Sequence, residues 1–273
     1  MPELPEVEVT RRGVAPHLIG QQVTQVVLRR AGLRWPFPEN LPELLLGQTV
    51  LAASRRGKYL LLEFHHGTVL IHLGMSGHLR IIPATTPAQK HDHIDIVVGK
   101  QALRMTDPRR FGAVLWHDAE DGDVNQHLLL RALGVEPLED VFTAELLYKQ
   151  TRQRRAAIKQ VLLAGDIVVG VGNIYASESL FRAKINPKIS AHRISLARYR
   201  LLAEEIRLTL RAAIEKGGST LRDFIGVDGQ TGYFQQSYFV YDRAGEQCRL
   251  CGTTIRQIKQ GQRSTFYCIN CQK

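Results

Sequence analysis

The sequence predicts a multidomain α+β protein with an antiparallel β-sandwich, a helical domain and a small C-terminal domain built on cysteines. Three observations predict this fold class. Short β-like runs fill the chain up to residue 117, helical patterns follow up to residue 225, and all four cysteines lie at or beyond residue 248. The acidic stretch 119–124 is a candidate linker. The expected domains are 1–120, 121–236 and 237–273.

The chain opens with MPELPEVEVT, and a helix is expected over residues 4–19. Apolar residues recur there at three- to four-residue steps or their multiples, and Gly20 ends the pattern. Pro5 suits the first helical turn, where its missing N–H has no partner to lose. Pro16 interrupts the pattern and predicts a kink or a shorter helix.

Short β-like runs come next, separated by Gly, Pro, Asn and Asp. Several alternate apolar and polar residues, as half-buried antiparallel strands do. Their number and close spacing favour a sandwich or a flattened barrel. The runs cover 22–30, 49–54, 58–64, 68–73, 78–82, 93–98, 102–107 and 113–117.

Helical patterns dominate beyond residue 124. A Gly-rich polar stretch at 226–237 is typical of a long loop. The expected helices cover 125–133, 143–153, 156–164, 173–183, 195–217 and 219–225.

The charge balance indicates a polyanionic partner. Lysine and arginine number 36 against 26 aspartates and glutamates, a net charge of +10. Nucleic acid is favoured over an anionic membrane surface, with an ordinary solvated basic face as the alternative. No apolar run approaches the roughly 20 residues that span a bilayer, and the acidic N-terminus lacks the apolar region of a signal peptide. We expect a cytoplasmic protein, associated with the nucleoid in a bacterium.

The cysteines are spaced as two C-x2-C pairs, CRLC and CINC, typical of a four-thiolate zinc site. An iron–sulfur cluster and two disulfides are the alternatives. One structural zinc ion held by Cys248, Cys251, Cys268 and Cys271 is expected, on which folding of this end depends. Arg263 lies between the pairs in a basic stretch suited to gripping phosphate, although it could be ordinary surface charge.

Two further motifs suit DNA. In VVGVGNIYASE (168–178), glycines permit a tight turn and Asn173 is expected to cap the next helix, so that its N–H groups face an anion. A plain interhelical turn is the alternative. In TDPRRFG (106–112), an arginine and a phenylalanine on one turn could enter a base stack, and Met75 could add an apolar plug. Each apolar residue taken alone is more often a core residue.

Together these pieces resemble the formamidopyrimidine-DNA glycosylases, relatives of endonuclease VIII. The resemblance covers essentially the whole chain in the expected order. The motifs are PELPEVE at 2–8, RRGKYL at 55–60, HLGMSG at 72–77, KHDH at 90–93, TDPRRFG at 106–112, GVGNIYASE at 170–178 and the finger ending YCINCQK.

The resemblance implies a β-sandwich, a helix-two-turn-helix domain and a zinc finger, acting as a monomer on double-stranded DNA that contains oxidised bases or abasic sites. It implies excision of oxidised purines such as 8-oxoguanine and formamidopyrimidines, followed by strand cleavage on both sides of the abasic sugar. Residues 217–237 would form a loop that closes over the damaged base.

The resemblance also assigns roles to single residues. Pro2 would be the nucleophile once Met1 is removed, and Glu3 the proton donor. The other implied roles are proton donation during elimination or phosphate contact (Lys58, Arg263), DNA contact (His72, His91, Arg109, Lys159, Asn173, Tyr175), filling of the space left by the flipped base (Met75, Arg109, Phe111) and the border of the lesion pocket (Glu6, Glu178).

The residue chemistry supports this reading. An α-amine titrates at about 8, far below the ~10.4 of lysine, so more of it is unprotonated and nucleophilic at neutral pH. A carboxyl next to that amine can shuttle the proton that the reaction needs. Where the family commonly carries an Asp, an amide and often a basic residue, this chain has Ala164-Gly165-Asp166. Two alternatives stay open: a preference for oxidised pyrimidines, and a non-catalytic damaged-DNA binding protein.

Overall fold

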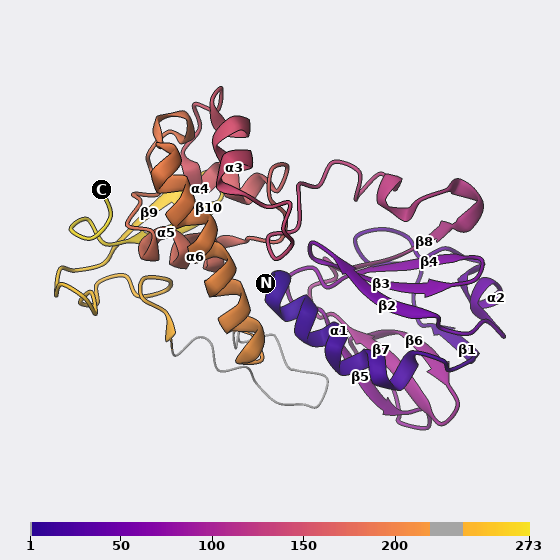
Figure 1. The fold of residues 1–273 in the computed structure, drawn as a ribbon. Helices are drawn as coiled ribbons and strands as arrows, with labels where there is room; N and C mark the ends of the chain where they lie inside the picture. Colours follow the sequence, from indigo (N-terminus) through magenta and orange to yellow (C-terminus); the bar gives the residue numbers. More distant parts are fainter. Residues whose placement is uncertain (1, 219–236) are drawn as a thin grey trace. The chain divides into compact units, whose positions relative to one another are not determined.

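The computed structural model describes residues 2–218 and 237–273. These residues form two compact units, 2–131 with 216–218 and 132–215 with 237–273 (Figure 1). The helix expected over 219–225 and nearly all of the loop expected over 226–237 lie outside the described residues. No described helix is long and apolar enough to cross a membrane.

The first unit is a sandwich of two antiparallel sheets with a helix, α1 (Leu4–Leu18), beside them. One sheet has the order β1-β6-β7-β5 and the other the order β2-β3-β4-β8. All eight expected strands are confirmed, with ends that shift by up to three residues. Their bounds are β1 (Val23–Leu28), β2 (Ala52–Arg56), β3 (Tyr59–Phe64), β4 (Gly67–His72), β5 (His78–Pro83), β6 (Asp92–Val98), β7 (Gln101–Thr106) and β8 (Ala113–Asp118).

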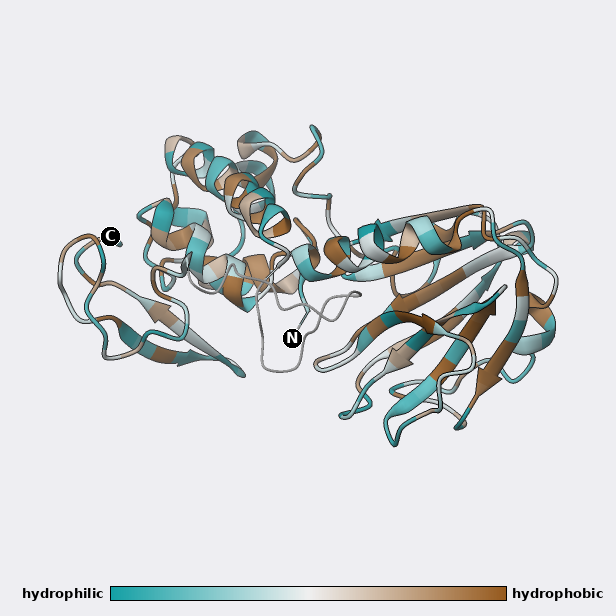
Figure 2. Ribbon diagram, turned by 90° about the horizontal axis from the view of Figure 1, so that it is seen from below, coloured by the Kyte–Doolittle hydropathy of each residue, from teal (hydrophilic) through white to brown (hydrophobic). Residues whose placement is uncertain are grey.

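One apolar core joins the two sheets and α1. It includes Leu60 and Leu62 of β3, Ile94 and Ile96 of β6, and Val14 of α1, all nearly inaccessible to solvent. The helix α1 contacts β2 and β3 of one sheet and β5 of the other. Apolar residues, coloured brown, occur along strands of the sandwich in Figure 2. Burial of this shared face makes the sandwich one cooperative body.

Two local expectations in this unit need correction. The helix α1 runs through Pro16 to Leu18. Pro16 therefore does not shorten it appreciably, because in the last turn only one main-chain hydrogen bond is lost. The expected helix over 125–133 is wrong. Only a short 3-10 turn, η2 (Val124–Gln126), forms there. Leu130 is buried but Leu128 is 66% exposed, so the run does not bury the continuous apolar face that would stabilise a helix.

Shorter elements complete the first unit. A five-residue helix, α2 (Leu41–Leu45), follows β1 and was not expected from the sequence. The 3-10 turn η1 (Ala119–Asp121) follows β8, and all three of its residues lie in the acidic stretch expected to be a linker.

The second unit contains four helices and a hairpin among its described residues. The helices are α3 (Ala144–Thr151), α4 (Ile158–Ala164), α5 (Asn173–Arg182) and α6 (Leu196–Glu215), with a 3-10 turn η3 (Ala191–Arg193), and the hairpin strands are β9 (Arg256–Gln260) and β10 (Arg263–Tyr267). Helices were expected at all four places. Phe181 of α5 shares an apolar cluster with Val240, Ile255 and Phe266 of the cysteine-bearing segment, so that segment packs on the helices.

Candidate active site and metal centre

The N-terminal motif is held by hydrogen bonds at the start of α1. Glu3 is the residue before the first helical turn, and its N–H donates to Glu6 Oε2 at 2.9 Å. In return the Glu3 carboxylate accepts from the Glu6 N–H, which completes a reciprocal capping box. Pro2, Glu3, Leu4 and Glu6 are all buried. The first described residues are therefore anchored where a chain end would otherwise fray.

Glu6 also meets the chain that follows α6. A methyl group built on Gly218 would lie 3.2 Å from Glu6 Oε1, and Gly218 itself has φ of +82°. The segment leaving α6 thus passes directly over the carboxylate three residues from Glu3. Residues far apart in the sequence meet here, beside the predicted nucleophile.

Glu8 ties α1 to the RRGKYL motif. Burial opposes its ionisation, but hydrogen bonds from Arg11 and Arg12 and the nearby charge of Arg55 outweigh that cost and lower its pKa to about 2. Arg55 Nε lies 3.4 Å from Glu8 Oε2. The end of β2 is thereby fastened to the helix that carries the N-terminus.

Lys58 lies in the two-residue turn that joins β2 to β3, after Gly57 at φ of +58°. The adjacent Tyr59 pairs with His72 of β4, and the two rings lie 4.8 Å apart. Burial, together with the positive charges of Lys58 and Arg34, lowers the pKa of His72 to about 4. Its Nδ1 accepts from the Gly74 N–H at 3.0 Å. His72 is thus a neutral acceptor that shapes the following turn, and its contact with DNA stays a prediction.

The three residues predicted to fill the space of a flipped base come from two adjoining turns. Met75 lies in the tight turn closed by the Gly77 N–H to Leu73 O bond. Phe111 is 44% exposed, and the Arg109 guanidinium lies 5.3 Å from the centre of its ring. A methyl group on Gly74 would come within 2.4 Å of the Phe111 carbonyl carbon. The structure therefore brings Met75, Arg109 and Phe111 together.

The KHDH histidines are placed differently from one another. His93 is buried, and its Nε2 lies 2.8 Å from the Asp107 carbonyl oxygen, so it is a structural histidine. His91 is half-buried before β6, and its carbonyl accepts from the Asp107 N–H at 3.0 Å. Asp107, which the sequence did not single out, therefore lies at the centre of several motifs.

In the second unit the glycine turn precedes α5, but Asn173 does not cap that helix. Gly172 is the capping residue, and Asn173 is the first residue inside the helix without a side-chain cap bond. Glycine tolerates this place because it has an extended backbone and no side chain to bury. Asn173 Oδ1 is buried without a hydrogen-bond partner among the described residues. Tyr175 is fully buried, and its contact with DNA stays a prediction.

Lys159 has internal partners that the sequence did not indicate. Its side chain is fully buried, and Nζ donates to Ser264 O at 3.0 Å and Thr265 Oγ1 at 2.9 Å. Its contact with DNA stays a prediction. Lys159 connects α4 to β10, next to Arg263, which is exposed at the start of that strand.

Glu178 also has a structural task that the sequence did not indicate. Both carboxylate oxygens accept main-chain N–H groups, from Phe239 to Oε2 and from Val240 and Tyr241 to Oε1, each at 2.9 Å. Burial raises the pKa of Glu178, and these hydrogen bonds oppose the rise. The carboxylate fixes the chain that leads into the cysteine segment, and its place beside a lesion stays a prediction.

The departure at 164–166 has a clear structural reason. Gly165 ends α4 in the left-handed conformation, at φ of +76°. Asp166 forms an ion pair with Arg154. The stretch is thus a regular helix end followed by a surface ion pair.

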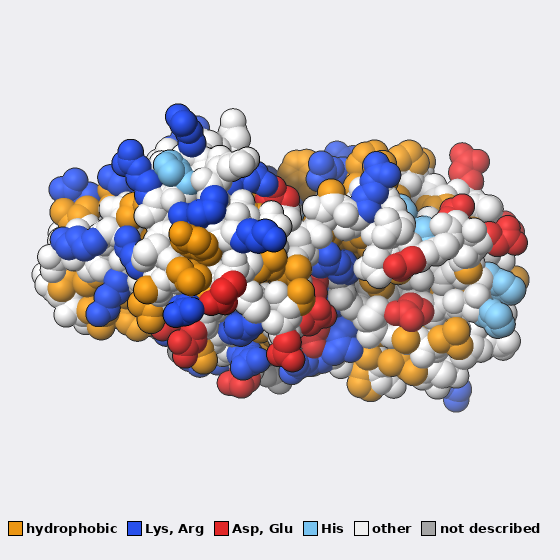
Figure 3. All heavy atoms as spheres, turned by 45° about the horizontal axis from the view of Figure 1, so that its top comes forward, with side chains coloured by type: hydrophobic (Ala, Val, Ile, Leu, Met, Phe, Trp, Pro, Cys, Tyr) orange, Lys and Arg blue, Asp and Glu red, His pale blue; other side chains and the backbone are white. Residues whose placement is uncertain are grey.

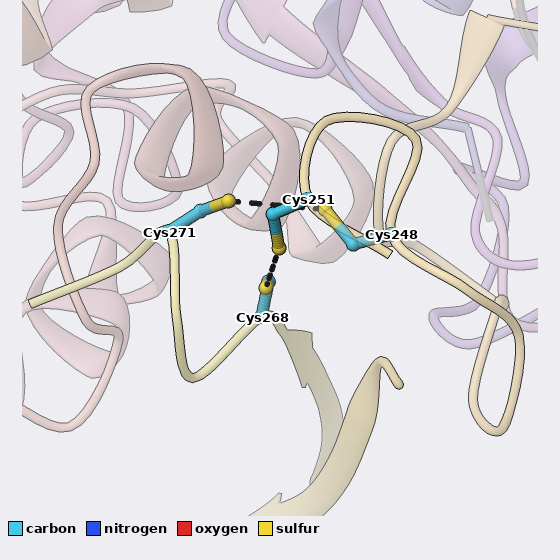
Figure 4. Close-up of side chains that lie close together, drawn as sticks. All are labelled: Cys248, Cys251, Cys268 and Cys271. Atoms are coloured by element: carbon cyan, nitrogen blue, oxygen red, sulfur yellow. Dashed lines mark hydrogen bonds between the residues drawn. The ribbon is translucent and has the colours of Figure 1, made fainter. Parts of the chain in front are cut away.

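The four cysteines form a metal centre (Figure 4). The ligand atoms of Cys248, Cys251, Cys268 and Cys271 all lie within 4.8 Å of one another. The Sγ atoms of Cys251 and Cys268 are 3.5 Å apart, and those of Cys248 and Cys271 are 3.9 Å apart. Tetrahedral zinc with Zn–S bonds of about 2.3 Å needs sulfurs about 3.8 Å apart. The donor set therefore fits one structural zinc ion.

Comparison with known proteins agrees with this geometry. Residues 1–114 match the formamidopyrimidine-DNA glycosylase N-terminal domain, residues 133–225 match the H2TH domain of the same proteins, and residues 245–273 match a zinc finger found in FPG and IleRS. Formamidopyrimidine-DNA glycosylases of Janthinobacterium sp. (strain Marseille) and Herminiimonas arsenicoxydans are 72% and 71% identical over the full length of both chains.

The chain belongs to the formamidopyrimidine-DNA glycosylase family.

Solved structures agree with this assignment. The Lactococcus lactis Fpg in complex with DNA containing an abasic site has a TM-score of 0.92 at 33% identity and full coverage of both chains. The Fpg protein of Thermus thermophilus has a TM-score of 0.89 at 35% identity, over 99% of this chain and 98% of that one.

Family membership confirms several predictions. The fold class is confirmed, as are the structural zinc site and the enzyme class, a DNA glycosylase and lyase of base-excision repair that acts on oxidised purines. The preference for oxidised pyrimidines and the non-catalytic binding protein are not favoured.

Proposed function

We propose that this chain excises oxidised purines through a Schiff base between the Pro2 nitrogen and the deoxyribose C1′, and that Glu3 moves the protons of that reaction. The observation that carries the proposal is the reciprocal capping box between Glu3 and Glu6, because it fixes Glu3, the residue bonded to Pro2, relative to α1. A nucleophile and its acid must hold their geometry to within a fraction of an ångström to be effective.

The chemistry follows from the nucleophile. After removal of Met1, the Pro2 nitrogen attacks C1′ as the bond from C1′ to the base breaks and the base leaves with a proton. Opening of the sugar ring leaves an iminium between Pro2 and C1′. That cation acidifies the C2′ proton, whose loss expels the 3′ phosphate, and a second elimination expels the 5′ phosphate. Glu3 lies next to the nitrogen in the chain and is the group placed to donate and accept these protons.

The basic and apolar groups of both units support binding to DNA. In this proposal Lys58, Asn173, Tyr175 and Arg263 bind phosphates, with His72 and His91 close to the backbone. Lys and Arg side chains gather on the visible face of the second unit in Figure 3. Such charge supplies most of the sequence-independent affinity for DNA. Met75, Arg109 and Phe111 fill the space left when the base is extruded.

The partner we propose is duplex DNA with an oxidised purine or an abasic site, bound by one copy of the chain. The Lactococcus lactis relative was solved with DNA containing an abasic site and with DNA containing Fapy-dG. We further propose that the protein works in the bacterial cytoplasm, on the nucleoid.

Borohydride trapping tests the nucleophile. We expect borohydride to reduce the iminium and link the protein covalently to a duplex that carries a single oxidised purine. Pro2→Gly, or a chain that retains Met1, should abolish most of the trapping, whereas Pro5→Ala, at the second position of α1, is the matched control. Full trapping by a chain that retains Met1 would overturn the assignment of Pro2.

A further inference from the structure

Asp107 joins the two turns that carry Met75, Arg109 and Phe111. Its side chain is fully buried at the end of β7. Oδ1 accepts the Ser76 hydroxyl at 2.7 Å and the Arg109 N–H at 3.2 Å, while Oδ2 accepts the Gly112 N–H at 2.8 Å. One carboxylate thus reaches the Met75 turn and both ends of the Arg109–Phe111 segment.

Further contacts connect the two turns directly. Ser76 is itself buried, and its oxygen also accepts the Arg109 N–H at 3.1 Å. A methyl group on Gly74 would meet the Gly112 nitrogen at 2.5 Å, so the main chains of the turns are in direct contact. Arg110, between the two exposed residues, has φ of +61°, a conformation that costs energy in a residue other than glycine. Surrounding hydrogen bonds must maintain that conformation.

We propose that Asp107 is a positioning residue for base extrusion. It does not touch DNA. It fixes the two turns to each other, so that Met75, Arg109 and Phe111 enter the base stack as one preformed wedge. This inference rests on the proposed role of those three residues. It assigns the rigidity of the wedge to a buried carboxylate rather than to the wedge side chains themselves.

The carboxylate is chemically specific in this place. Hydrogen-bond donors face both of its oxygens, and an ionised carboxylate is an acceptor at both atoms. In Asp107→Asn one of the two atoms becomes an NH2 group. If it faces Gly112, the Gly112 N–H loses its acceptor. If it faces Ser76, the hydroxyl must reverse its role and the Arg109 N–H keeps only Ser76 Oγ as acceptor. The asparagine keeps the size of the side chain, which makes it a test of the hydrogen bonds rather than of packing.

The experiment compares duplex with single-stranded substrates. D107N and Phe111→Ala are assayed for excision of an oxidised purine from a duplex, and for nicking of a single-stranded oligonucleotide with an abasic site, which has no stack to fill. Asp118→Asn is the control, since Asp118 also accepts a main-chain N–H, from Glu120 at 2.9 Å, but at the far end of β8. Circular dichroism checks that each variant is folded at the assay temperature.

We expect D107N and F111A each to lower kcat/KM on the duplex by about tenfold or more, since a displacement of about 1 Å can cost ~100-fold in rate. Nicking of the single strand should stay within about twofold of the parent protein, and D118N should match the parent on both substrates. The double variant D107N/F111A should be little worse than F111A alone, because both changes disable the same wedge.

The outcomes separate the role of Asp107 from the wedge role of the three side chains. If F111A loses duplex activity while D107N behaves like D118N, the role of Asp107 fails and the wedge stands. If F111A retains duplex activity, the proposed wedge fails, and this inference fails with it. If D107N loses both activities equally, Asp107 is only a fold residue and the inference is overturned. If D107N does not fold, Ser76→Ala takes its place. This variant removes only the hydrogen bonds of Ser76 with Asp107 and with the Arg109 N–H, and the same assays then test whether the link between the two turns matters for duplex activity.

Discussion

The start of α1 and the β9–β10 hairpin hold their predicted catalytic and DNA-contacting groups by different means. Around α1 the anchors are carboxylates. Glu3 and Glu6 cap the helix, and Glu8 binds arginine side chains of α1 and interacts with the charge of an arginine of β2. Around the hairpin the anchors are the four cysteines, which precede β9 and follow β10, and the buried ammonium of Lys159. The first region is supported by a large apolar sandwich core, whereas the second has only a small cluster. A small core needs a metal or an equivalent cross-link to be stable.

Removal of zinc should produce the largest effect. Structural zinc contributes on the order of 10 kcal/mol to the folding of small domains. With a chelator we expect β9 and β10 to lose their structure, DNA affinity to collapse, and the strands of the sandwich to remain folded. Hydrogen exchange of the main-chain amides, with zinc content measured in parallel, checks this. If the hairpin amides stayed protected after zinc was lost, the hairpin would not depend on the metal for its structure, and the contrast with α1 would be wrong.

The next largest effect should follow Lys159→Met. This change leaves the Ser264 carbonyl and the Thr265 hydroxyl without the ammonium that they bind. Loss of a buried, charge-assisted partner costs about 2–4 kcal/mol, so denaturant unfolding should detect it. Lys149→Met, on an exposed position of α3, is the control. If K159M instead bound DNA more weakly at unchanged stability, Lys159 would act by direct contact with DNA and not by connecting α4 to β10.

The smallest effect should be the pH dependence of α1. The pKa of Glu8 is about 2 in the folded protein against an ordinary 4.5. Its stabilising contribution is therefore present above pH ~4.5 and lost as the pH falls towards 2. Glu8→Gln should lower the free energy of unfolding at pH 7 by at most about 3 kcal/mol, and by progressively less in acid. Urea titrations at several pH values measure this difference. Glu145→Gln, which removes an exposed ion pair with Arg200, should show only a weak dependence of the same sign, because solvent screens that pair.

Part of the site could be predicted because it depends on local chemistry. The PELPEVE motif contains both halves of a capping box, and the two C-x2-C pairs specify a metal centre by spacing alone. Strand positions followed from alternation and turn residues. The family motifs then pointed to Pro2, Glu3 and the wedge residues, although the sequence alone cannot show that Met75 and Phe111 lie on touching turns.

The internal contacts that the sequence did not predict share a physical cause. Lys159, Glu178 and Asp107 are charged residues that ordinary composition places on the surface, yet all three are fully buried. Their partners lie far along the chain for Lys159 and Glu178, 105 and 61 residues away in the bonds to Ser264 and Phe239. The helix expected over 125–133 was wrong for the opposite reason, since Leu130 is buried while Leu128 stays exposed and no continuous apolar face is covered.

The sequence by itself determined the order of the elements, the zinc ligands and the chemical character of the N-terminus, because these depend on residue type, spacing and neighbours within a turn or two. The tertiary structure alone decided which charged groups became internal anchors. A buried charge is tolerated only where distant main-chain and side-chain partners converge on it, and that convergence is a property of the folded chain.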